Sequence, residues 1–548
     1  MPHFSQEKSP LKVFTPLPEG TLLATRLNGW ERLGDSFEFT VSLLSAQGGS
    51  DSFSDLLGKN AAVSVTLPGG SVRHYHGEIW CFRQGNSDND FRHHTLVLRP
   101  RLARLGLTRQ SRIFQNQTAL EILKVVLEPV GGADFQVRGQ PPSRNYCTQY
   151  RETDLEFFLR LCFEEGIVHY WQHSADGHRL VLTDRSNQGP SLGKVEYDQT
   201  VGGSTNQPAL RSWELSQTLG ITAVDLQDSH FQLFGQKLSA GANGPEAVVA
   251  GRQSLRPSGS LAAWQEDAGS GARYFDGVNS SGAGDGQALS QIYPAQDRQA
   301  QIMARAAASG SVRALAEGDC CQLAPGNSFH LIRHPDQDGL WLVVAATHTL
   351  TVQGRFWAGE SSNVRCEVAV EAAPFELLQA PWPPRPRPHV GGVLTALVIG
   401  PAGQELFVDS YGRIQVRFSW DRAEALSSCW VRVAQVWAGN TWGAAFWPRV
   451  GHEVVVAFED GDPDRPLVVG SVYNAANMPP FPLPASKYIA GWKSLTEGGD
   501  PSKNSHQILM GDEKGSEAVL IHSESVCMIH QEKEQFSYRP SVSINLQG

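Results

Sequence analysis

Short runs of alternating apolar and polar residues, separated by glycine and proline turns, occupy much of this chain. Residues 27–45 (LNGWERLGDSFEFTVSLLS) and 60–82 (NAAVSVTLPGGSVRHYHGEIWCF) each follow the pattern of a strand, a glycine turn and a second strand. The 548 residues include 54 glycines and 32 prolines, spread among β-branched and aromatic residues. This pattern predicts a mainly β protein of short strands joined by tight turns.

Three segments are expected to be helices. Two of them begin with a capping box, a threonine followed three positions later by a glutamate, which stabilises a helix N-terminus by about 1 kcal/mol. The boxes are Thr118 with Glu121 in residues 116–131, and Thr153 with Glu156 in residues 150–171. A glycine ends each helix, and IVHYW after the second is expected to be a strand. The third helix is predicted in residues 294–310 (PAQDRQAQIMARAAASG).

Composition excludes several classes of function. The net charge of -10 argues against a general affinity for nucleic acid or anionic membranes. The N-terminus, MPHFSQEKSPLKVF, lacks the apolar core of a secretory signal, and no apolar stretch approaches the ~18 residues of a membrane span. We expect a protein made in the cytosol that, if exported, leaves without a cleaved signal. The length predicts three or more domains.

The cysteines predict no disulfide framework or zinc site. They lack CxxC spacing, and in a long chain made in a reducing compartment they are expected to be buried free thiols. The adjacent pair Cys320–Cys321 is expected to lie in a strand with its side chains on opposite faces. The eight positions are Cys81, Cys147, Cys162, Cys320, Cys321, Cys366, Cys429 and Cys527.

A proline-rich segment divides the chain. Five prolines between Pro381 and Pro388 force an extended, semi-rigid conformation, so the major domain boundary is placed there. From residue 393 to about 473 the chain is almost wholly strand and turn, and residues 475–505 are loop-like. The last forty residues are too few to hold a core alone, and we expect them to need partner chains.

This tail repeats Ile-His at a spacing of eight, in IHSESVCM and IHQEKEQF. A fixed period of this kind favours a solenoid or β-helix. His522 and His530 then stack on one face, and three chains bring six imidazoles together. Two interpretations stay open: a metal ion threaded between the imidazoles, or histidines on a solvated face.

Residues 437–470 (WAGNTWGAAFWPRVGHEVVVAFEDGDPDRPLVVG) contain two incomplete metal motifs. His452-Glu453 begins a zincin HExxH motif, but Val456 occupies the second histidine position, in a strand-like run. The spacing of Asp460, Asp462 and Asp464 is that of a calcium loop. Its sixth and twelfth positions, where glycine and a bidentate glutamate are needed, are Arg465 and Ser471. The acidic stretch therefore predicts a turn.

Two further patterns are weak. GPSLG, with Ser191 at its centre, matches a hydrolase nucleophile elbow, but strand-like KVEYD follows where a helix is required. Four histidines lie near one another in the first hundred residues, and we expect them on neighbouring strands as polar residues of a solvated face. They are His74, His76, His93 and His94. No catalytic, cofactor-binding or metal-binding residue is assigned, and no enzymatic activity is expected.

Residues 429–474 (CWVRVAQVWAGNTWGAAFWPRVGHEVVVAFEDGDPDRPLVVGSVYN) closely resemble the signature segment of VgrG proteins. These are spike-tip proteins of bacterial type VI secretion systems, related to the hub and central spike of contractile phage tails. Residues 27–45 and 144–171 resemble the hub region of this family, as does LLGKNAAVSVTL. The segment HQILMGDEKGSEAVLIHSE resembles the start of its β-helical needle. The resemblance thus covers nearly the whole chain.

The resemblance implies a mainly β architecture: a hub of related β-barrel modules with a few helices, an OB-type barrel, and the start of a trimeric β-helix or β-prism needle. By similarity, residues 1–380 are the hub, 381–392 a proline-rich linker and 393–475 the OB-fold-like barrel. Residues 476–505 are a second linker, and 506–548 begin the needle. The phage relatives often carry a lysozyme domain between barrel and needle, and the thirty residues here are too few for one. Some relatives carry a C-terminal toxin domain, and the needle here, which stops at Gly548, is shorter than the family implies.

The function that the resemblance implies is mechanical. A homotrimer caps the Hcp hexameric tube and carries a PAAR tip protein. It contacts the baseplate, and it transports effector proteins or their adaptors while piercing the target membrane without a stable anchor. It assembles in the cytoplasm and is then secreted through the apparatus. Two alternatives remain: a phage tail baseplate hub, or a spike with hydrolase activity.

Overall fold

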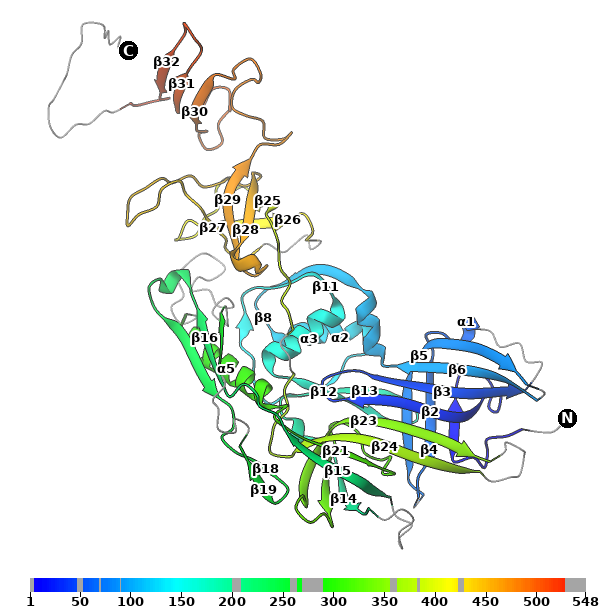
Figure 1. The fold of residues 1–548 in the computed structure, drawn as a ribbon. Helices are drawn as coiled ribbons and strands as arrows, with labels where there is room; N and C mark the ends of the chain where they lie inside the picture. Colours follow the sequence, from blue (N-terminus) through cyan, green and yellow to red (C-terminus); the bar gives the residue numbers. More distant parts are fainter. Residues whose placement is uncertain are drawn as a thin grey trace. The chain divides into compact units, whose positions relative to one another are not determined.

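A computed structural model describes most of the chain (Figure 1). The described residues are 4–46, 53–68, 70–88, 90–199, 208–256, 264–268, 289–354, 362–381, 385–421 and 428–527. They form two compact units. Unit 1 comprises Met1–Val393, Ser419–Trp430 and Ala457–Leu467, and unit 2 comprises Leu394–Phe418, Val431–Val456 and Val468–Gly548.

Twelve strands of unit 1 form one sheet, in the order β1-β4-β5-β6-β3-β2-β23-β22-β14-β15-β21-β24. The first six are β1 (Leu11–Phe14), β4 (Asn60–Thr66), β5 (Val72–Ser87), β6 (Phe91–Arg99), β3 (Phe37–Ala46) and β2 (Leu23–Arg32). The other six are β23 (Gly339–Gln353), β22 (Ser328–Ile332), β14 (Ser191–Tyr197), β15 (Ala209–Gln217), β21 (Val312–Gly318) and β24 (Asn363–Pro374). Because β24 also pairs with β23, the second six close into a barrel.

Alternation of buried side chains explains why these runs are strands. Along β3, Phe37, Phe39, Val41 and Leu43 are at most 1% exposed, while the residues between them are partly exposed. The turn before β3 contains Gly34 at φ 75°, a conformation that costs glycine little. The two predicted hairpins are confirmed as β2–β3 and β4–β5.

The remaining strands of unit 1 form small sheets around the helices (Figure 1). Those before residue 190 are β7 (Arg109–Phe114), β8 (Gln117–Thr118), β9 (Asp134–Gln136), β10 (Ser143–Arg144), β11 (Cys147–Thr153), β12 (Val168–His173) and β13 (His178–Thr183). Those after it are β16 (Ala223–Asp228), β17 (Leu238–Asn243), β18 (Val248–Ala250), β19 (Gln253–Leu255) and β20 (Trp264–Ala268).

The three predicted helices are confirmed. The described helices are α1 (Phe53–Leu56), α2 (Ala119–Leu127), α3 (Asp154–Glu165) and α5 (Ile292–Ala308). Both capping boxes form, with Thr118 and Thr153 accepting from the backbone N–H of the glutamate three residues on. Gly166 ends α3 at φ 65°, and IVHYW continues into β12 as expected. The sequence predicted one apolar face on α3, but the structure also buries its polar side.

Buried ion pairs explain how α3 tolerates that burial. Arg144 of β10 donates to Glu164 at 2.7 Å and to Glu165 at 2.6 Å. Arg160 donates to Glu152 of β11 at 2.6 Å and lies 3.4 Å from Glu164. Burial alone disfavours a charged guanidinium, but the facing carboxylates raise the pKa of Arg160 well above its usual value. Charge pairing and hydrogen bonding offset the desolvation of these groups.

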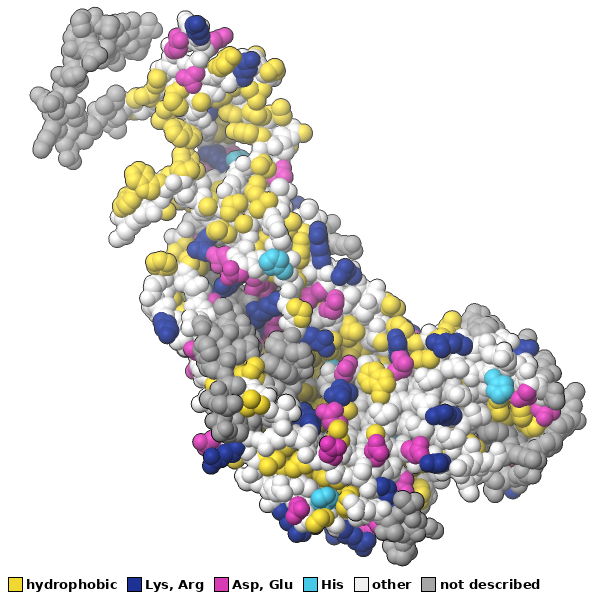
Figure 2. All heavy atoms as spheres, in the orientation of Figure 1, with side chains coloured by type: hydrophobic (Ala, Val, Ile, Leu, Met, Phe, Trp, Pro, Cys, Tyr) yellow, Lys and Arg dark blue, Asp and Glu magenta, His cyan; other side chains and the backbone are white. Residues whose placement is uncertain are grey.

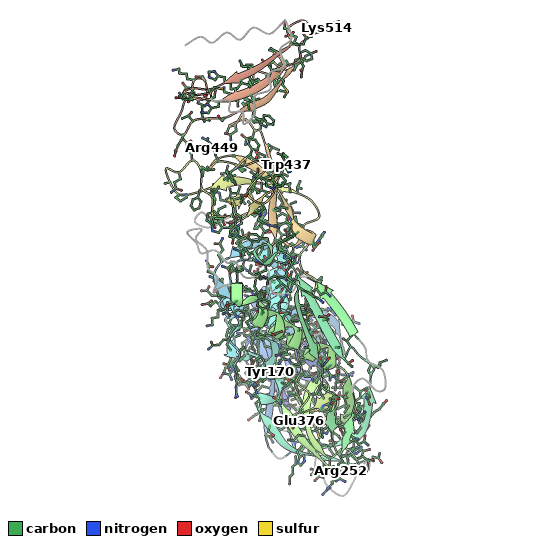
Figure 3. The ribbon with its side chains drawn as sticks, turned by 90° about the vertical axis from the view of Figure 1, so that its left-hand side faces the viewer. Tyr170, Arg252, Glu376, Trp437, Arg449 and Lys514 are labelled. Atoms are coloured by element: carbon green, nitrogen blue, oxygen red, sulfur yellow. The ribbon has the colours of Figure 1, made fainter. Side chains whose placement is uncertain are left out.

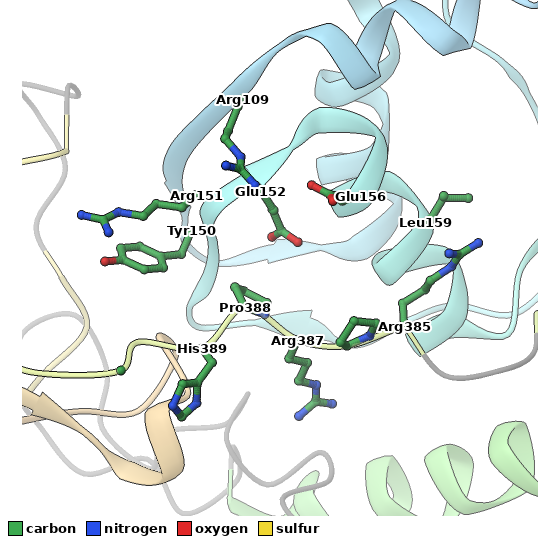
Figure 4. Close-up of a pocket in the computed structure, with 12 residues that line it drawn as sticks. Arg109, Tyr150, Arg151, Glu152, Glu156, Leu159, Arg385, Arg387, Pro388 and His389 are labelled. Atoms are coloured by element: carbon green, nitrogen blue, oxygen red, sulfur yellow. The ribbon is translucent and has the colours of Figure 1, made fainter.

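The same cluster reaches two distant segments. Arg298 of α5 pairs with Glu165, and Arg387 of the proline-rich segment lies 3.3 Å from Glu164. Figure 4 shows this segment beside the start of α3, with a pocket between them. The pocket's lining residues include Arg109, Tyr150, Glu152, Arg385 and His389. The proline-rich segment is therefore held against α3 by charge.

Unit 2 contains two sheets. The first has the order β26-β25-β28-β29-β27, and the second β30-β31-β32. Their strands are β25 (Leu394–Ile399), β26 (Gln415–Phe418), β27 (Arg432–Val433), β28 (Glu453–Phe458), β29 (Pro466–Val472), β30 (Ile489–Lys493), β31 (Gln507–Gly511) and β32 (Ala518–His522). The first sheet confirms the strand-and-turn character of residues 393–473. β30 lies in the stretch that the sequence indicated as loop, because an exposed strand lacks the alternation that marks a half-buried one.

The prediction for Cys320 and Cys321 is wrong. Both follow β21 in a turn rather than a strand, and both are fully buried. The N–H of Cys321 donates to the carbonyl of Asp319, which folds the backbone back on itself. All eight cysteines are free thiols, although Cys527 is exposed. None of the helices described is long and apolar enough to cross a membrane.

Breaking the cluster at α3 is expected to destabilise unit 1 strongly. Replacing Arg144 with methionine removes the one guanidinium that binds both Glu164 and Glu165 and leaves each buried carboxylate with weaker compensation, and breaking a buried pair typically costs about 3–5 kcal/mol. Urea denaturation followed by tryptophan fluorescence measures this cost. Arg32→Met is the control, because the Arg32–Glu371 pair is exposed and contributes about 1 kcal/mol or less. Equal costs for the two substitutions would contradict the interpretation.

Candidate assembly surfaces

The His-Glu pair lies at the start of a strand. β28 runs from Glu453 to Phe458 with Val456 fully buried, so the predicted strand is confirmed. His452 accepts through Nδ1 from the backbone N–H of Arg449 at 3.3 Å. The Glu453 carboxylate accepts from the side-chain amide of Asn474 at 2.8 Å. Both side chains thus take part in turns that flank the sheet.

The acidic stretch is the predicted turn. Residues Glu459–Gly461 form a short 3₁₀ turn in which Asp460 has a φ of 51°. Asp462 accepts from the backbone N–H of Asp464 at 3.0 Å. Asp464, in turn, accepts from the backbone N–H of Thr148 at 2.7 Å. These carboxylates bind backbone donors and hold the segment on unit 1.

Ser191 is the first residue of β14, so a strand follows it and not a helix, as the sequence indicated. Its hydroxyl accepts from the backbone N–H of Gly193 at 3.3 Å. A nucleophile elbow requires a strand that turns directly into a helix. The backbone at Ser191 has a different geometry.

The expectation that four N-terminal histidines share a solvated face is wrong for two of them. The histidines do lie on neighbouring strands, β5 and β6. However, His76 and His94 are each only 3% exposed. His94 binds the hydroxyl of Ser45 at 2.9 Å, and Nδ1 of His76 lies 2.9 Å from Nδ1 of His178. Each buried imidazole has a polar partner from another strand, which the local sequence does not reveal.

The sequence also missed a buried polar cluster in the N-terminal half of the sheet. Glu31 of β2 pairs with Arg73 of β5 and binds Nε2 of His348 of β23 at 2.9 Å. His173 of β12 lies 3.7 Å from the same carboxylate. Burial favours the neutral form of Glu31, but Arg73 and His348 hold its pKa at about 2. The cluster is therefore a buried carboxylate neutralised mainly by one guanidinium.

The histidines around this cluster are held neutral. Burial lowers the pKa of both His173 and His348 to about 4, with Arg73 adding to the effect. Burial also lowers the pKa of His76 to about 4. Because His173 is neutral near pH 7, its contact with Glu31 is not an ion pair there. Four strands that are far apart in sequence must meet to build this environment.

A cluster of exposed aromatic residues lies in unit 2, in the hairpin of residues 436–447. The hairpin is closed by the bridge Ala438–Gly443, and Trp437 packs edge-on against Trp442 at 5.0 Å. Figure 3 labels Trp437 in this unit. Its large apolar residues are 40–88% exposed: Val436, Trp437, Trp442, Phe446 and Trp447. Their exposure shows that these side chains do not form the core of unit 2.

The sheet β30-β31-β32 exposes apolar side chains on both faces, although Leu509 of its central strand is only 8% exposed. In β32, Val519 and Ile521 are 74% and 61% exposed on one face, and Leu520 is 50% exposed on the other. Trp492 of β30 and Ile508 of β31 are also about half exposed. Figure 2 shows hydrophobic side chains gathered over this part of unit 2. An exposed apolar surface of this kind is typical of a sheet that packs against another surface.

His522 ends β32 and is exposed, while His530 lies outside the described residues. Among the described residues, no group of three His, Cys, Asp or Glu side chains is arranged to hold a metal ion. The metal interpretation of these two histidines therefore stays a prediction. The surfaces of unit 2 expose large apolar side chains, which are suited to packing against another surface.

Two family models match the chain. Residues 30–354 match the phage tail baseplate hub family (GPD). Residues 408–473 match the type VI secretion system/phage-baseplate injector OB domain. The first match spans more than half of the chain, and the second lies within residues 393–475, where the sequence predicted an OB-type barrel.

Curated relatives align over most of the chain. The type VI secretion system spike protein VgrG1b of Pseudomonas aeruginosa is 32% identical over 541 residues, which cover 97% of this chain and 69% of the relative. The actin cross-linking toxin VgrG1 of Vibrio cholerae is 31% identical over 93% of this chain. The alignment covers 45% of that toxin, so most of its length has no counterpart here.

A solved structure has the same fold. An Escherichia coli type VI secretion component, c3393, described as similar to the T4 phage tail proteins gp27 and gp5, aligns with a TM-score of 0.55. The alignment covers 84% of this chain and 99% of that one, at 19% identity. The predicted architecture, a mainly β hub followed by an OB-type domain, is confirmed.

Acid is expected to destabilise unit 1 through its buried histidines. The pKa of these histidines in the unfolded chain is near 6.5, and folding lowers the pKa of His173 and His348 to about 4. Between these values the unfolded state binds more protons, so stability is full above pH 6.5 and falls as pH drops toward 4. Glu31 extends the loss below pH 4.5 because its folded pKa is about 2.

The measurement is the urea midpoint between pH 7.5 and 4. The double variant His173→Gln, His348→Gln removes both titrating groups, so its midpoint is expected to change less with pH than that of the unchanged chain. His93→Gln is the matched control, because His93 is exposed and hydrogen-bonded to Asp88. An unchanged pH slope in the double variant would refute this role.

Proposed function

The chain belongs to the VgrG family of type VI secretion system spike proteins, and we propose that three copies of it assemble into a spike that caps the Hcp tube. On contraction of the sheath the spike is driven through a target envelope. The role is mechanical: it holds partners and transmits force. Identity of about one third over nearly the whole chain to named spike proteins supports this proposal.

The observation that carries the trimer is the sheet β30-β31-β32. Most of its apolar residues face solvent in a single chain, and Leu509 of β31, at 8% exposed, is the exception. Burying one such side chain stabilises an assembly by about 1.5–3 kcal/mol, and the sheet supplies several. Three copies wrapped about one axis give each sheet a packed inner face, and they cover the strand edges, which otherwise invite aggregation. We propose residues 506–548 as the start of this needle.

The remaining divisions follow from similarity. We propose residues 1–380 as the hub, 381–392 as the linker, 393–475 as the barrel and 476–505 as a second linker. The aromatic hairpin at 436–447 supplies a further contact surface between copies. Aromatic residues of this kind are enriched at the centres of protein interfaces.

The proposed partners are the Hcp tube, baseplate components, a PAAR tip protein and effector proteins or their adaptors. Assembly takes place in the cytoplasm, and the spike then leaves through the secretion apparatus into the medium or a target cell. It pierces the target membrane without a stable anchor, and it binds no nucleic acid. The net charge of -10 supports that last point.

We further propose that this chain is not an enzyme. The enzyme-like residues of the sequence have structural tasks: Ser191 and Asp464 bind backbone N–H groups, and Val456 is buried in a strand. The Vibrio cholerae relative is named a toxin, but it extends far beyond the aligned part. The proposal assigns no catalytic, cofactor-binding or metal-binding residue.

A phage tail baseplate hub is the second candidate, because the family model over residues 30–354 carries that description. Both candidates use the same trimeric fold. Genes for a sheath and tube with type VI secretion membrane components nearby favour secretion, and genes for capsid and tail assembly favour a virion.

The trimer predicts a solution mass three times the 59.8 kDa of one chain. Replacing Val519 and Ile521 together with aspartate places six charges in the proposed inner packing of three chains. We expect the dissociation concentration to rise at least tenfold, since one lost side-chain contact of about 1.5 kcal/mol already gives that factor. Light scattering across micromolar concentrations measures the mass, and electron microscopy reports threefold symmetry.

Leu107→Asp is the matched control, because Leu107 is 76% exposed but lies in unit 1. It is expected to leave the mass unchanged. Circular dichroism of each variant checks that the fold is retained. A mass of one chain for the unchanged protein at every concentration would refute the trimer.

A further inference from the structure

A cavity of about 200 Å³ lies in unit 1, where several separate parts of the chain meet. They are the turn between β2 and β3, the helix α3, the strand β12, the residues that follow α5 and the residues that follow β24. All the residues that line the cavity belong to unit 1. The cavity is smaller than the about 300–1,000 Å³ typical of sites for drug-sized ligands, so it suits a small ion.

Basic side chains from three elements line this cavity. Arg32 ends β2, Arg313 belongs to β21, and Arg385 belongs to the proline-rich segment. Asp35 is the one acidic residue among the described residues of the lining. Glu371 of β24 pairs with both Arg32 and Arg313, each at 2.9 Å. Two carboxylates thus face three guanidinium groups, which leaves one positive charge in excess.

The guanidinium groups differ in how firmly they are held. Arg313 donates to Glu371 and, at 2.7 Å, to the side-chain carbonyl of Gln379, so its position at the cavity is fixed. Arg385 is exposed and has no hydrogen bond or ion pair with another described residue. Leu159 of α3 lines the same cavity, and Figure 4 shows the Arg385 side chain extending toward it. A planar guanidinium of this kind matches the oxygen atoms of a phosphate or a carboxylate.

A buried imidazole adds a further polar group to the lining. His169 of β12 is 1% exposed, and its ring packs edge-on against Phe158 at 5.3 Å. Its Nδ1 is buried and has no hydrogen-bond partner among the described residues. Burial lowers the pKa of His169 to about 4 against the opposing charge of Asp35, so the ring is neutral near pH 7. An unpaired buried nitrogen is costly, and a ligand that hydrogen-bonds to it removes that cost.

We propose that this cavity is a binding site for a phosphate group, held by the guanidinium of Arg385 and the imidazole of His169 beside the fixed Arg313. A phosphate accepts hydrogen bonds from several directions, which fits donors that come from three separate elements. The buried apolar side chains of Leu33, Val168 and Val344 form part of the same lining. They keep water away and so strengthen the attraction between the anion and the guanidinium groups.

A bound phosphate joins the proline-rich segment to β12 and β21 within one chain. Because the site exists only in the folded chain, the ligand stabilises unit 1, and the stabilisation grows with the logarithm of the phosphate concentration. The site lies within a single chain and does not depend on the proposed spike function. The mass of the assembly is measured separately, so failure of this proposal and failure of the trimer are distinguishable.

The test is calorimetric titration of the full chain with inorganic phosphate, with chloride used to keep the ionic strength constant. We expect one phosphate bound per chain and a melting temperature that rises with phosphate concentration. A second titration with glycerol 3-phosphate distinguishes the free ion from a small phosphate ester, and tighter binding of either one identifies the source of the phosphate group. Absence of saturable binding in both titrations would overturn the proposal.

Variants test the residues of the site. Arg385→Gln is expected to raise the Kd for phosphate by about tenfold or more, since one charge-assisted hydrogen bond is typically worth that factor. Its exposed position leaves the fold intact, which circular dichroism checks. His169→Gln is expected to weaken binding as well. Arg252→Gln is the matched control, because Arg252 is exposed, pairs with Asp338 and lies outside the lining of the cavity. Equal Kd values for Arg385→Gln and Arg252→Gln would refute the site.

Discussion

The buried charge cluster on α3 is the interaction on which the packing of unit 1 around this helix depends. Arg144 and Arg160 face Glu164 and Glu165 with side chains that are at most 4% exposed. Each charge is costly to bury alone, so the cluster stabilises one arrangement and penalises any that leaves a member unpaired. Because its partners come from β10, β11, α5 and the proline-rich segment, a single set of ion pairs determines where four separate parts of the chain lie.

Unit 2 differs from unit 1 in that many of its large apolar side chains are exposed to solvent. The sheet β30-β31-β32 and the aromatic hairpin expose large side chains that water solvates poorly. In unit 1 the chain satisfies its own buried charges, whereas in unit 2 it leaves apolar surface for other chains. This contrast supports the proposal that the hub folds by itself and that the needle is completed by assembly. In the most distinctive segment, residues 437–470, with three tryptophans and five aspartates and glutamates, residues 459–464 form a turn and the three tryptophans are exposed.

Local signals were sufficient for many elements. The capping boxes at Thr118 and Thr153 marked two helix starts, and glycine turns marked the hairpins β2–β3 and β4–β5. Residues that do not fit a motif were equally informative. Val456 occupies the position of the second histidine in the HExxH motif and lies in a strand-like run, whereas that motif requires a helix. Local signals were not sufficient for the histidines. His76 and His94 looked like residues of a solvated face, because the groups that bury them belong to strands elsewhere in the chain.

The sequence by itself determined the family, the mainly β class, the two helix starts at Thr118 and Thr153 and the mismatch of each metal or nucleophile motif, because these depend on spacing within a few residues. Only the tertiary structure decided which polar groups are buried together. His348 meets Glu31 across 317 residues, and His76 meets His178 across 102 residues. Such contacts are set by strand order in a closed barrel, and strand order depends on packing of the whole chain rather than on any local pattern.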